Sequence, residues 1–368
     1  MKLNNLSILK NNGLNVPNFT TDINKVDWSL SAVRSSADIE DNSNSSCAGL
    51  FDSFLNVSKN ELREKVVGNI GKVIVGKEEV VTQLLTALLA DGHVLLEDVP
   101  GTGKTKVAKS LAKSLDAAFS RIQFTPDLLP GDITGLTIYD QKKGEFVLRK
   151  GPAFTNILLA DEINRATPRT QAGLLECMEE RQITIDGDSY PACVPFFVIA
   201  TQNPVETAGT FPLPEAQMDR FMMKLSMGLP TKEEERQIME RYMKDEPLAV
   251  LEPVLTLDEL KAAKEEIENI YVHKCVLEYM VDMVAATREG ENVLMGVSPR
   301  GTLAFLRCVK AYAYLQGRNF VTPDDVKALA VPVLAHRVVM GYGKAGENKA
   351  FVENIIRTTT VPTEEFSA

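Results

Sequence analysis

The chain has 368 residues, 44% of them hydrophobic and 24% charged, a composition typical of a globular protein with room for two ordinary domains. Its formal charge of −10 at pH 7 argues against a broad nucleic-acid-binding surface, and no apolar run forms a membrane span or a signal-peptide core, so we expect a cytoplasmic protein. The five scattered cysteines and three widely separated histidines argue against a disulfide framework and a zinc site, and we expect the histidines at the surface or the edge of the core.

The first 58 residues differ from the rest of the chain. Residues 35–46 are crowded with Ser, Asp and Asn, which indicates a loop. From residue 61 to about residue 230, stretches with helical spacing alternate with short apolar runs. We expect buried strands over residues 94–96, 157–160 and 196–200, an alternating strand over residues 119–124, and helices over residues 80–89 and 170–180. This alternation predicts an α/β core in which helices flank a parallel sheet.

Two hairpins, over residues 136–148 and 182–192, are expected to project from this core. Beyond residue 230 the pattern becomes helical, and only residues 319–321 are strand-like. The expected helices cover residues 233–243, 257–268, 274–287, 300–316 and 323–335. We therefore expect four parts: an N-terminal appendage (1–58), an α/β core (59–230), an all-α domain (231–340) and a C-terminal tail (341–368).

The segment from residue 94 to residue 105 is the most informative in the chain. It joins an apolar strand, a glycine turn, and a Lys-Thr pair that opens a helix. Backbone N–H groups at a helix N-terminus point toward an anion, so this order predicts a cradle for nucleotide phosphates, the alternative being a chance glycine turn. Lys104 is expected to reach the β and γ phosphates, and the Thr105 hydroxyl to ligate Mg²⁺. Asp98 stands where the usual G-x-x-x-x-G-K-[ST] pattern has its first glycine. The residues expected to bind the nucleotide here are Pro100, Gly101, Thr102, Gly103, Lys104 and Thr105.

Candidate catalytic groups follow the third and fourth expected strands. Asp161 and Glu162 come directly after one, and Asn203 comes just past the other. Ligands of an open parallel sheet bind outside the carboxyl ends of its strands, so we expect these side chains beside the phosphate loop. Asp161 is suited to hold Mg²⁺ through water, Glu162 to deprotonate the attacking water, and Asn203 to hydrogen-bond the γ-phosphate or that water. The alternatives are an acidic pair that merely opens a loop and an asparagine that caps the turn before Pro204.

Two arginines are candidates for contact with phosphates. An arginine from a neighbouring subunit can stabilise the charge on a transferred phosphoryl group, and Arg220 is suited to this role. The alternative is an ion pair within the chain, for example with Asp219 or Glu215. Arg300 follows Ser298, which we expect to cap a helix. A cation in the first helical turn opposes the helix dipole, which hints at contact with the γ-phosphate, the alternative being a solvated side chain.

These motifs, in this order, resemble those of the AAA+ ATPases and, within them, the MoxR family, over residues 59–362. The segments that carry the resemblance are DVPGTGKT (98–105), LLPGDITG (128–135), LLADEINRA (158–166), ATQNP (200–204) and FPLPEAQMDRF (211–221). The resemblance implies Walker A residues at Lys104 and Thr105, Walker B residues at Asp161 and Glu162, sensor 1 at Asn203, an arginine finger at Arg220 and sensor 2 at Arg300. It also implies that Val75 and Gly76 contact the adenine and that the hairpins are the helix-2 and pre-sensor insertions of this group.

The same resemblance implies a P-loop AAA+ core, a C-terminal all-α lid, and ATP with Mg²⁺ as ligands. Proteins of this family typically form hexameric rings with nucleotide between subunits. They are thought to act as chaperones that mature or activate partner proteins, often ones with von Willebrand factor A-type domains. The alternatives are a nucleic-acid motor, against which the acidic balance counts, and a non-hydrolysing nucleotide switch, against which Glu162 and Arg220 count.

Residues 32–57 carry a second, unrelated resemblance, to the nucleotide-binding domain of phosphoenolpyruvate synthase and pyruvate phosphate dikinase. In those enzymes the arginine that matches Arg34 lies at the ATP phosphates. Only about the first sixty residues match, too few to complete an ATP-grasp site, so we expect a non-catalytic appendage. A phosphotransferase acting on pyruvate is an alternative that these residues alone suggest.

Overall fold

The computed structural model describes residues 32–33, 54–55, 59–204, 209–243, 246–290, 292–341 and 346–362. The chain divides into two compact units, Met1–Ser58 and Lys59–Ala368. In the first unit, β1 (Ala32–Val33) pairs antiparallel with β2 (Phe54–Leu55). Arg34 lies outside the described residues. No described helix combines the length and the apolar character needed to cross a membrane.

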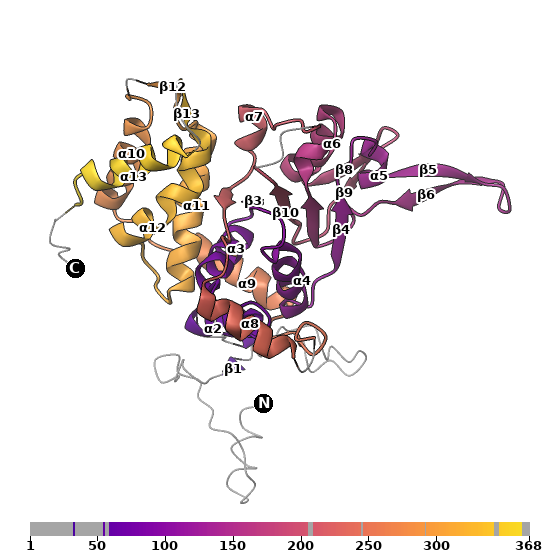
Figure 1. Ribbon diagram of the computed structural model, residues 1–368, viewed down its shortest axis with the longest axis horizontal. Helices are drawn as coiled ribbons and strands as arrows, with labels where there is room; N and C mark the ends of the chain where they lie inside the picture. Colours follow the sequence, from indigo (N-terminus) through magenta and orange to yellow (C-terminus); the bar gives the residue numbers. More distant parts are fainter. Residues whose placement is uncertain are drawn as a thin grey trace, which may run out of the picture. The chain divides into compact units, whose positions relative to one another are not determined.

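A five-stranded parallel sheet forms the centre of the second unit (Figure 1), with the strand order β11–β3–β10–β7–β4. The strands are β3 (Val94–Glu97), β4 (Phe119–Gln123), β7 (Ile157–Asp161), β10 (Phe197–Gln202) and β11 (Met223–Leu225). Four of them lie where the sequence predicts strands, whereas β11 is too short to give a clear pattern. Because all neighbouring strands pair in parallel, their carboxyl ends share one edge.

The central strands separate two hydrophobic cores. In β3, Val94 and Leu96 lie in the larger core, whereas Leu95 between them lies in the smaller one. The same alternation recurs in β7 and β10, which explains why these strands are apolar at every position. The larger core is covered by α2 (Lys59–Gly71), α3 (Glu78–Leu89) and α4 (Lys104–Ser114), and the smaller one by α6 (Pro168–Glu180).

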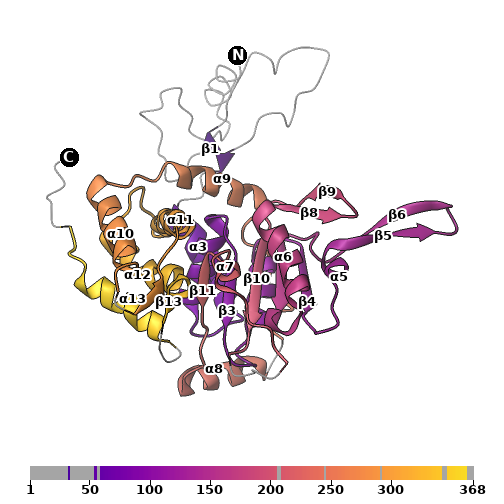
Figure 2. The same cartoon turned by 90° about the horizontal axis from the view of Figure 1, so that it is seen from above.

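Two antiparallel hairpins are present at the expected places. β5 (Gly135–Asp140) pairs with β6 (Glu145–Lys150), and β8 (Gln182–Ile185) pairs with β9 (Asp188–Pro191). The β5–β6 hairpin extends far from the sheet in both views (Figures 1 and 2). Shorter elements link these parts: α5 (Pro130–Thr134), η3 (Ile163–Arg165) and α7 (Glu215–Met218).

The part of the chain beyond β11 is mainly helical. Its helices are α8 (Lys232–Tyr242), α9 (Leu257–Glu268), α10 (Lys274–Ala286), α11 (Pro299–Leu315), α12 (Pro323–Leu334), η4 (Ala335–Arg337) and α13 (Glu347–Thr358). The expectation of strand character only at residues 319–321 is wrong, because β12 (Val293–Met295) pairs with β13 (Val339–Met340). The segment expected as a tail contains α13, which packs on α12 and η4.

Candidate active site

The phosphate loop joins β3 to α4 at the carboxyl edge of the sheet. Gly101 and Gly103 have φ angles of +84° and +91°, in the left-handed region that glycine tolerates best. The Lys104 ammonium donates hydrogen bonds to two carbonyl oxygens of the loop, those of Asp98 at 2.8 Å and Val99 at 3.3 Å. Burial lowers the pKa of Lys104, and three nearby carboxylates oppose that shift. A cation is therefore held at the mouth of a backbone cradle suited to phosphate.

Asp98, which replaces the usual first glycine, is buried, and both of its carboxylate oxygens accept hydrogen bonds. Its carboxylate accepts hydrogen bonds from Ser226 Oγ at 2.8 Å, Met227 N at 2.5 Å and Gly228 N at 3.1 Å. These three residues directly follow β11 and lead toward α8. The departure from the glycine pattern thus ties the phosphate loop to the connection between the sheet and the helical domain.

The expected acidic pair lies at the end of β7, on the same edge. Glu162 has a φ angle of +57°, so the chain turns sharply directly after Asp161. Thr201 of β10 fixes this turn, because its hydroxyl donates to Asp161 Oδ1 at 2.6 Å and accepts from Glu162 N at 2.8 Å. Asn203 follows β10 and is 6% exposed. The neighbouring Gln202 accepts a backbone hydrogen bond from Asp98 N at 3.3 Å, so the strand end that carries Asn203 borders the phosphate loop, as expected.

Sequence reasoning missed two residues of β4 that contact the acidic pair. Gln123 Nε2 donates to Glu162 Oε2 at 2.8 Å, and Arg121 Nη2 donates to Asp161 Oδ2 at 2.8 Å. Arg165 Nε also lies 2.9 Å from Glu162 Oε2. Polar residues at alternate positions at the end of a strand were the available signal, but pairing of β4 with β7 is needed to bring them to the acids.

The residues at this edge fit a magnesium–nucleotide complex. The cradle has glycine where the backbone turns left-handed, and the hydroxyl of Thr105 and the carboxylate of Asp161 are hard oxygen donors of the kind that Mg²⁺ prefers. In the segment expected to contact adenine, Val75 is buried and Gly76 has a φ of +65°. A methyl group on Gly76 would stand 1.6 Å from Glu234 Oε1, so this segment lies directly against α8.

Arg220 and Arg300 meet on one carboxylate, away from the phosphate loop. Arg220 Nε lies 3.0 Å from Glu179 Oε2, and Arg300 Nη2 contacts Glu179 Oε1. The alternative expected for Arg220, an ion pair within the chain, is therefore present, but its partner is Glu179 and not Asp219 or Glu215. Both arginines line a pocket of about 510 Å³ together with residues that directly precede β3 and β10. The pocket thus lies at the amino edge of the sheet, opposite the edge of the phosphate loop.

His93 is one of the residues lining this pocket, and it is buried rather than placed at the edge of the core. Its Nδ1 accepts a hydrogen bond from Val198 N at 3.0 Å, and its Nε2 lies 3.0 Å from Met178 O, which assigns the proton to Nε2. Burial lowers the pKa of His93 to about 3. His336 is also buried, so the expectation of peripheral histidines is wrong for both residues.

Comparisons with known proteins agree with this geometry. Residues 93–223 match the family described as the ATPase family associated with various cellular activities (AAA), and residues 285–358 match the AAA lid domain. Uncharacterized protein YeaC of Bacillus subtilis is 48% identical over 82% of this chain and 95% of its own length. Chaperone MoxR1 of Mycobacterium tuberculosis is 40% identical over 81% of this chain and 82% of its own length, and Protein MoxR of Paracoccus denitrificans is 31% identical over 77% and 90%.

A solved structure gives the same picture. A crystal structure of a protein from Cytophaga hutchinsonii has a TM-score of 0.77 and 39% sequence identity, covering 83% of this chain and 96% of that one. The fold is therefore an α/β AAA core followed by a helical lid, and the matches extend over both. With these matches and the phosphate loop, acidic pair and lid in place, the chain belongs to the MoxR family of AAA ATPases.

Proposed function

We propose that this ATPase works as a hexameric ring, in keeping with the family resemblance, and couples Mg²⁺-dependent hydrolysis to the remodelling or activation of a partner protein. One observation carries the proposal. The groups suited to bind and cleave a triphosphate lie at the carboxyl edge of the sheet, whereas Arg220 and Arg300 lie together at the amino edge. A protomer that holds its own arginines away from its own phosphates requires those of a neighbour.

The residues at the carboxyl edge divide the work of hydrolysis. The phosphate loop and Lys104 hold the triphosphate, and Glu162 accepts a proton from the attacking water, which Asn203 orients. Gln123 Nε2 donates to Glu162 Oε2 at 2.8 Å and so orients the carboxylate that accepts the proton. Thr105 and Asp161 would hold Mg²⁺, which would supply positive charge beside the phosphates.

Arg220 and Arg300 supply the charge that completes the site in the next protomer. Their common partner Glu179 is an intramolecular carboxylate, and a γ-phosphate is a stronger anion for a pair of guanidinium groups. A contact between the amino edge of one protomer and the carboxyl edge of the next uses two different surfaces. Such head-to-tail contacts form a ring when the rotation from one protomer to the next closes.

The client of this ring is proposed to be a protein, with one that carries a von Willebrand factor A-type domain as the first candidate. The similarity to Chaperone MoxR1 of Mycobacterium tuberculosis supports a protein client. Addition of a purified partner with such a domain should raise the steady-state ATPase rate, and addition of double-stranded DNA should leave it unchanged.

The decisive experiment pairs two variants with complementary defects. Glu162→Gln should bind ATP with Mg²⁺ and hydrolyse it poorly, because the general base is lost, whereas Arg220→Ala should bind ATP and fail to activate its neighbour. Mixed in equal amounts, they should recover about a quarter of the wild-type rate, since half the protomers offer an intact site and half offer an intact arginine. A mixture as inactive as its components would refute action between subunits, and wild-type turnover of Glu162→Gln would refute the base.

A further inference from the structure

A buried guanidinium joins the helical lid to the segment that carries Arg220. Arg337 of η4 is 4% exposed, and its Nε donates to Asp219 Oδ1 at 2.7 Å. Its Nη2 donates to Phe221 O at 2.7 Å and Asp219 O at 3.3 Å, and its Nη1 donates to Met222 O at 3.1 Å and to Val333 O. All five N–H groups of the guanidinium therefore have acceptors. Lysine, with three donors on one nitrogen, cannot reproduce this set.

The contacts of Arg337 surround a single residue of the chain. Asp219 precedes Arg220, and Phe221 and Met222 follow it, so the guanidinium holds the backbone on both sides of Arg220. The Arg220 side chain is left to extend into the pocket, where it meets Glu179. We call Arg337 and its hydrogen bonds to residues 219, 221 and 222 the clasp. The clasp fixes the backbone from which the Arg220 side chain extends.

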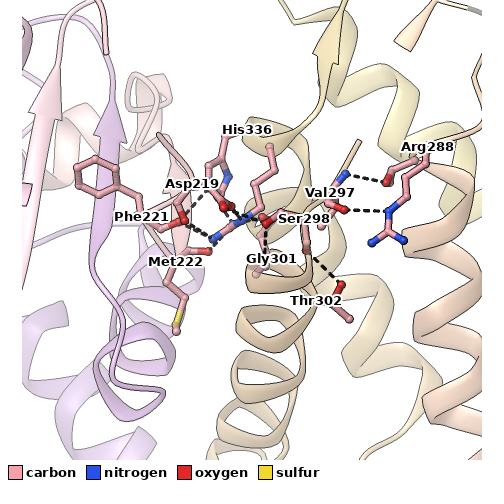
Figure 3. Close-up of polar contacts among 12 residues, drawn as sticks. Asp219, Phe221, Met222, Arg288, Val297, Ser298, Gly301, Thr302 and His336 are labelled. Carbon is pink, nitrogen blue, oxygen red and sulfur yellow. Dashed lines mark hydrogen bonds and ion pairs between the residues drawn. The ribbon is translucent and has the colours of Figure 1, made fainter. Parts of the chain in front are cut away.

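The Asp219 carboxylate, which accepts from Arg337, also contacts the start of α11, the helix that carries Arg300. Ser298 Oγ donates to Asp219 Oδ2 at 2.9 Å and accepts from Gly301 N at 3.2 Å as the cap of α11 (Figure 3). Asp219 therefore bonds to Arg337 with one oxygen and to Ser298 with the other. Asp219 lies one residue before Arg220, and Ser298 lies two residues before Arg300. Their hydrogen bond therefore joins the two segments that carry these arginines.

We infer that Arg337 is a positioning residue that holds Arg220 and Arg300 as one unit, so that both reach the γ-phosphate of the neighbouring protomer together. The inference rests on the proposed action of these arginines between subunits. A displacement of about 1 Å at a catalytic group costs up to roughly 100-fold in rate. Loosening the clasp should therefore lower turnover without weakening the binding of ATP, which takes place at the opposite edge.

The test compares Arg337→Lys with Arg318→Lys. Arg318 forms a comparable pair with Asp325 inside the lid and touches none of the residues beside Arg220. We expect Arg337→Lys to lower kcat roughly 10- to 100-fold while KM for ATP changes by less than about twofold. Arg318→Lys should lose thermal stability and keep its kcat. A wild-type kcat in folded Arg337→Lys would overturn the inference.

Mixing separates a positioning role from a merely structural one. Arg337→Lys should regain activity when mixed with Glu162→Gln, whose arginines are intact, and should not when mixed with Arg220→Ala. If Arg220→Ala is rescued by Glu162→Gln but Arg337→Lys is not, this inference is wrong and the proposed function stands. If neither is rescued, the proposed function itself fails.

A milder variant covers the case in which Arg337→Lys melts below the assay temperature. Asp219→Asn keeps an oxygen for the Arg337 Nε–H and loses the carboxylate that also accepts from Ser298. It should give a smaller loss of kcat with the same pattern of rescue. An unchanged kcat in Asp219→Asn would likewise overturn the inference.

Discussion

At the scale of single residues, Asp98 illustrates how a motif position can change its task. A glycine at this point of a phosphate loop serves the turn of the backbone, whereas the Asp98 side chain is buried against the segment after β11. Its carboxylate accepts two backbone N–H groups and a hydroxyl, which repays the cost of burying the charge. The side chain is therefore a structural link between the loop and the lid connection.

Restoring the usual glycine should weaken the protein. Asp98→Gly leaves the N–H groups of Met227 and Gly228 without their acceptor and should lower the free energy of unfolding by roughly 1–3 kcal/mol, measured by urea denaturation. Asp116→Asn, at a left-handed turn position that asparagine tolerates, is the control and should change it by less than about 0.5 kcal/mol. An Asp98→Gly protein as stable as the wild type would show that the link contributes nothing.

The residues near the phosphates could be predicted from the sequence because strand ends and glycine turns leave local patterns. Their partners could not. Glu179 lies 41 residues before Arg220 and 121 before Arg300, and nothing in its helical surroundings distinguishes it from the adjacent Glu180. Ion pairs between distant elements depend on packing, which periodicity does not report. The clasp of Arg337 was missed for the same reason.

At the scale of elements, the start of α11 depends on close approach. Gly301 lies against the clasp, and a methyl group there would stand 2.7 Å from both Arg337 Cδ and Val297 Cγ1. The sequence predicted this helix and its Ser298 cap, but not the reason for glycine in its first turn. It also missed β11, β12 and β13, since strands of two or three residues are too short for an alternation to be visible.

Two glycine substitutions in helices should therefore have opposite effects. Gly68→Ala, in α2 with no atom within 4 Å of the added methyl group, should raise the free energy of unfolding by roughly 0.5–1 kcal/mol, the difference in helix propensity. Gly301→Ala should lower it by roughly 1–3 kcal/mol through overpacking. Both values come from urea denaturation at neutral pH. Stabilisation by both substitutions would mean that the side chains around Gly301 move readily to accommodate a methyl group.

At the scale of the whole second unit, the two cores meet at a sheet whose amino edge is held by a buried histidine. His93 at the start of β3 bonds to β10 through Val198 N and to α6 through Met178 O. Arg220 and Arg300 lie at the same edge, and His93 lines the pocket that contains them, so its hydrogen bonds stabilise the wall of this pocket. The hydrogen bond from Val198 N requires an unprotonated Nδ1, so protonation of the ring would break it, whereas Nε2 keeps its proton for Met178 O.

This arrangement makes stability depend on pH with a defined sign. The folded protein keeps His93 neutral down to a pKa of about 3, whereas the unfolded chain takes up a proton near 6.5. The unfolded state therefore binds more protons in this range, and the free energy of unfolding falls as pH falls from about 6.5 toward 3. From pH 7 to pH 5, the titration of His93 should lower the free energy of unfolding by about 2 kcal/mol.

Comparison with a variant isolates this contribution from that of the carboxylates and of His336, whose pKa burial also lowers. His93→Gln should be less stable than the wild type at pH 7, since glutamine cannot place its amide to serve both Val198 N and Met178 O. The difference in the free energy of unfolding between the wild type and His93→Gln should be about 2 kcal/mol smaller at pH 5. The reason is that only the wild type loses stability through the titration of His93. Equilibrium urea unfolding at both pH values measures this difference, and a difference of constant size would mean that His93 titrates alike in the folded and unfolded chain.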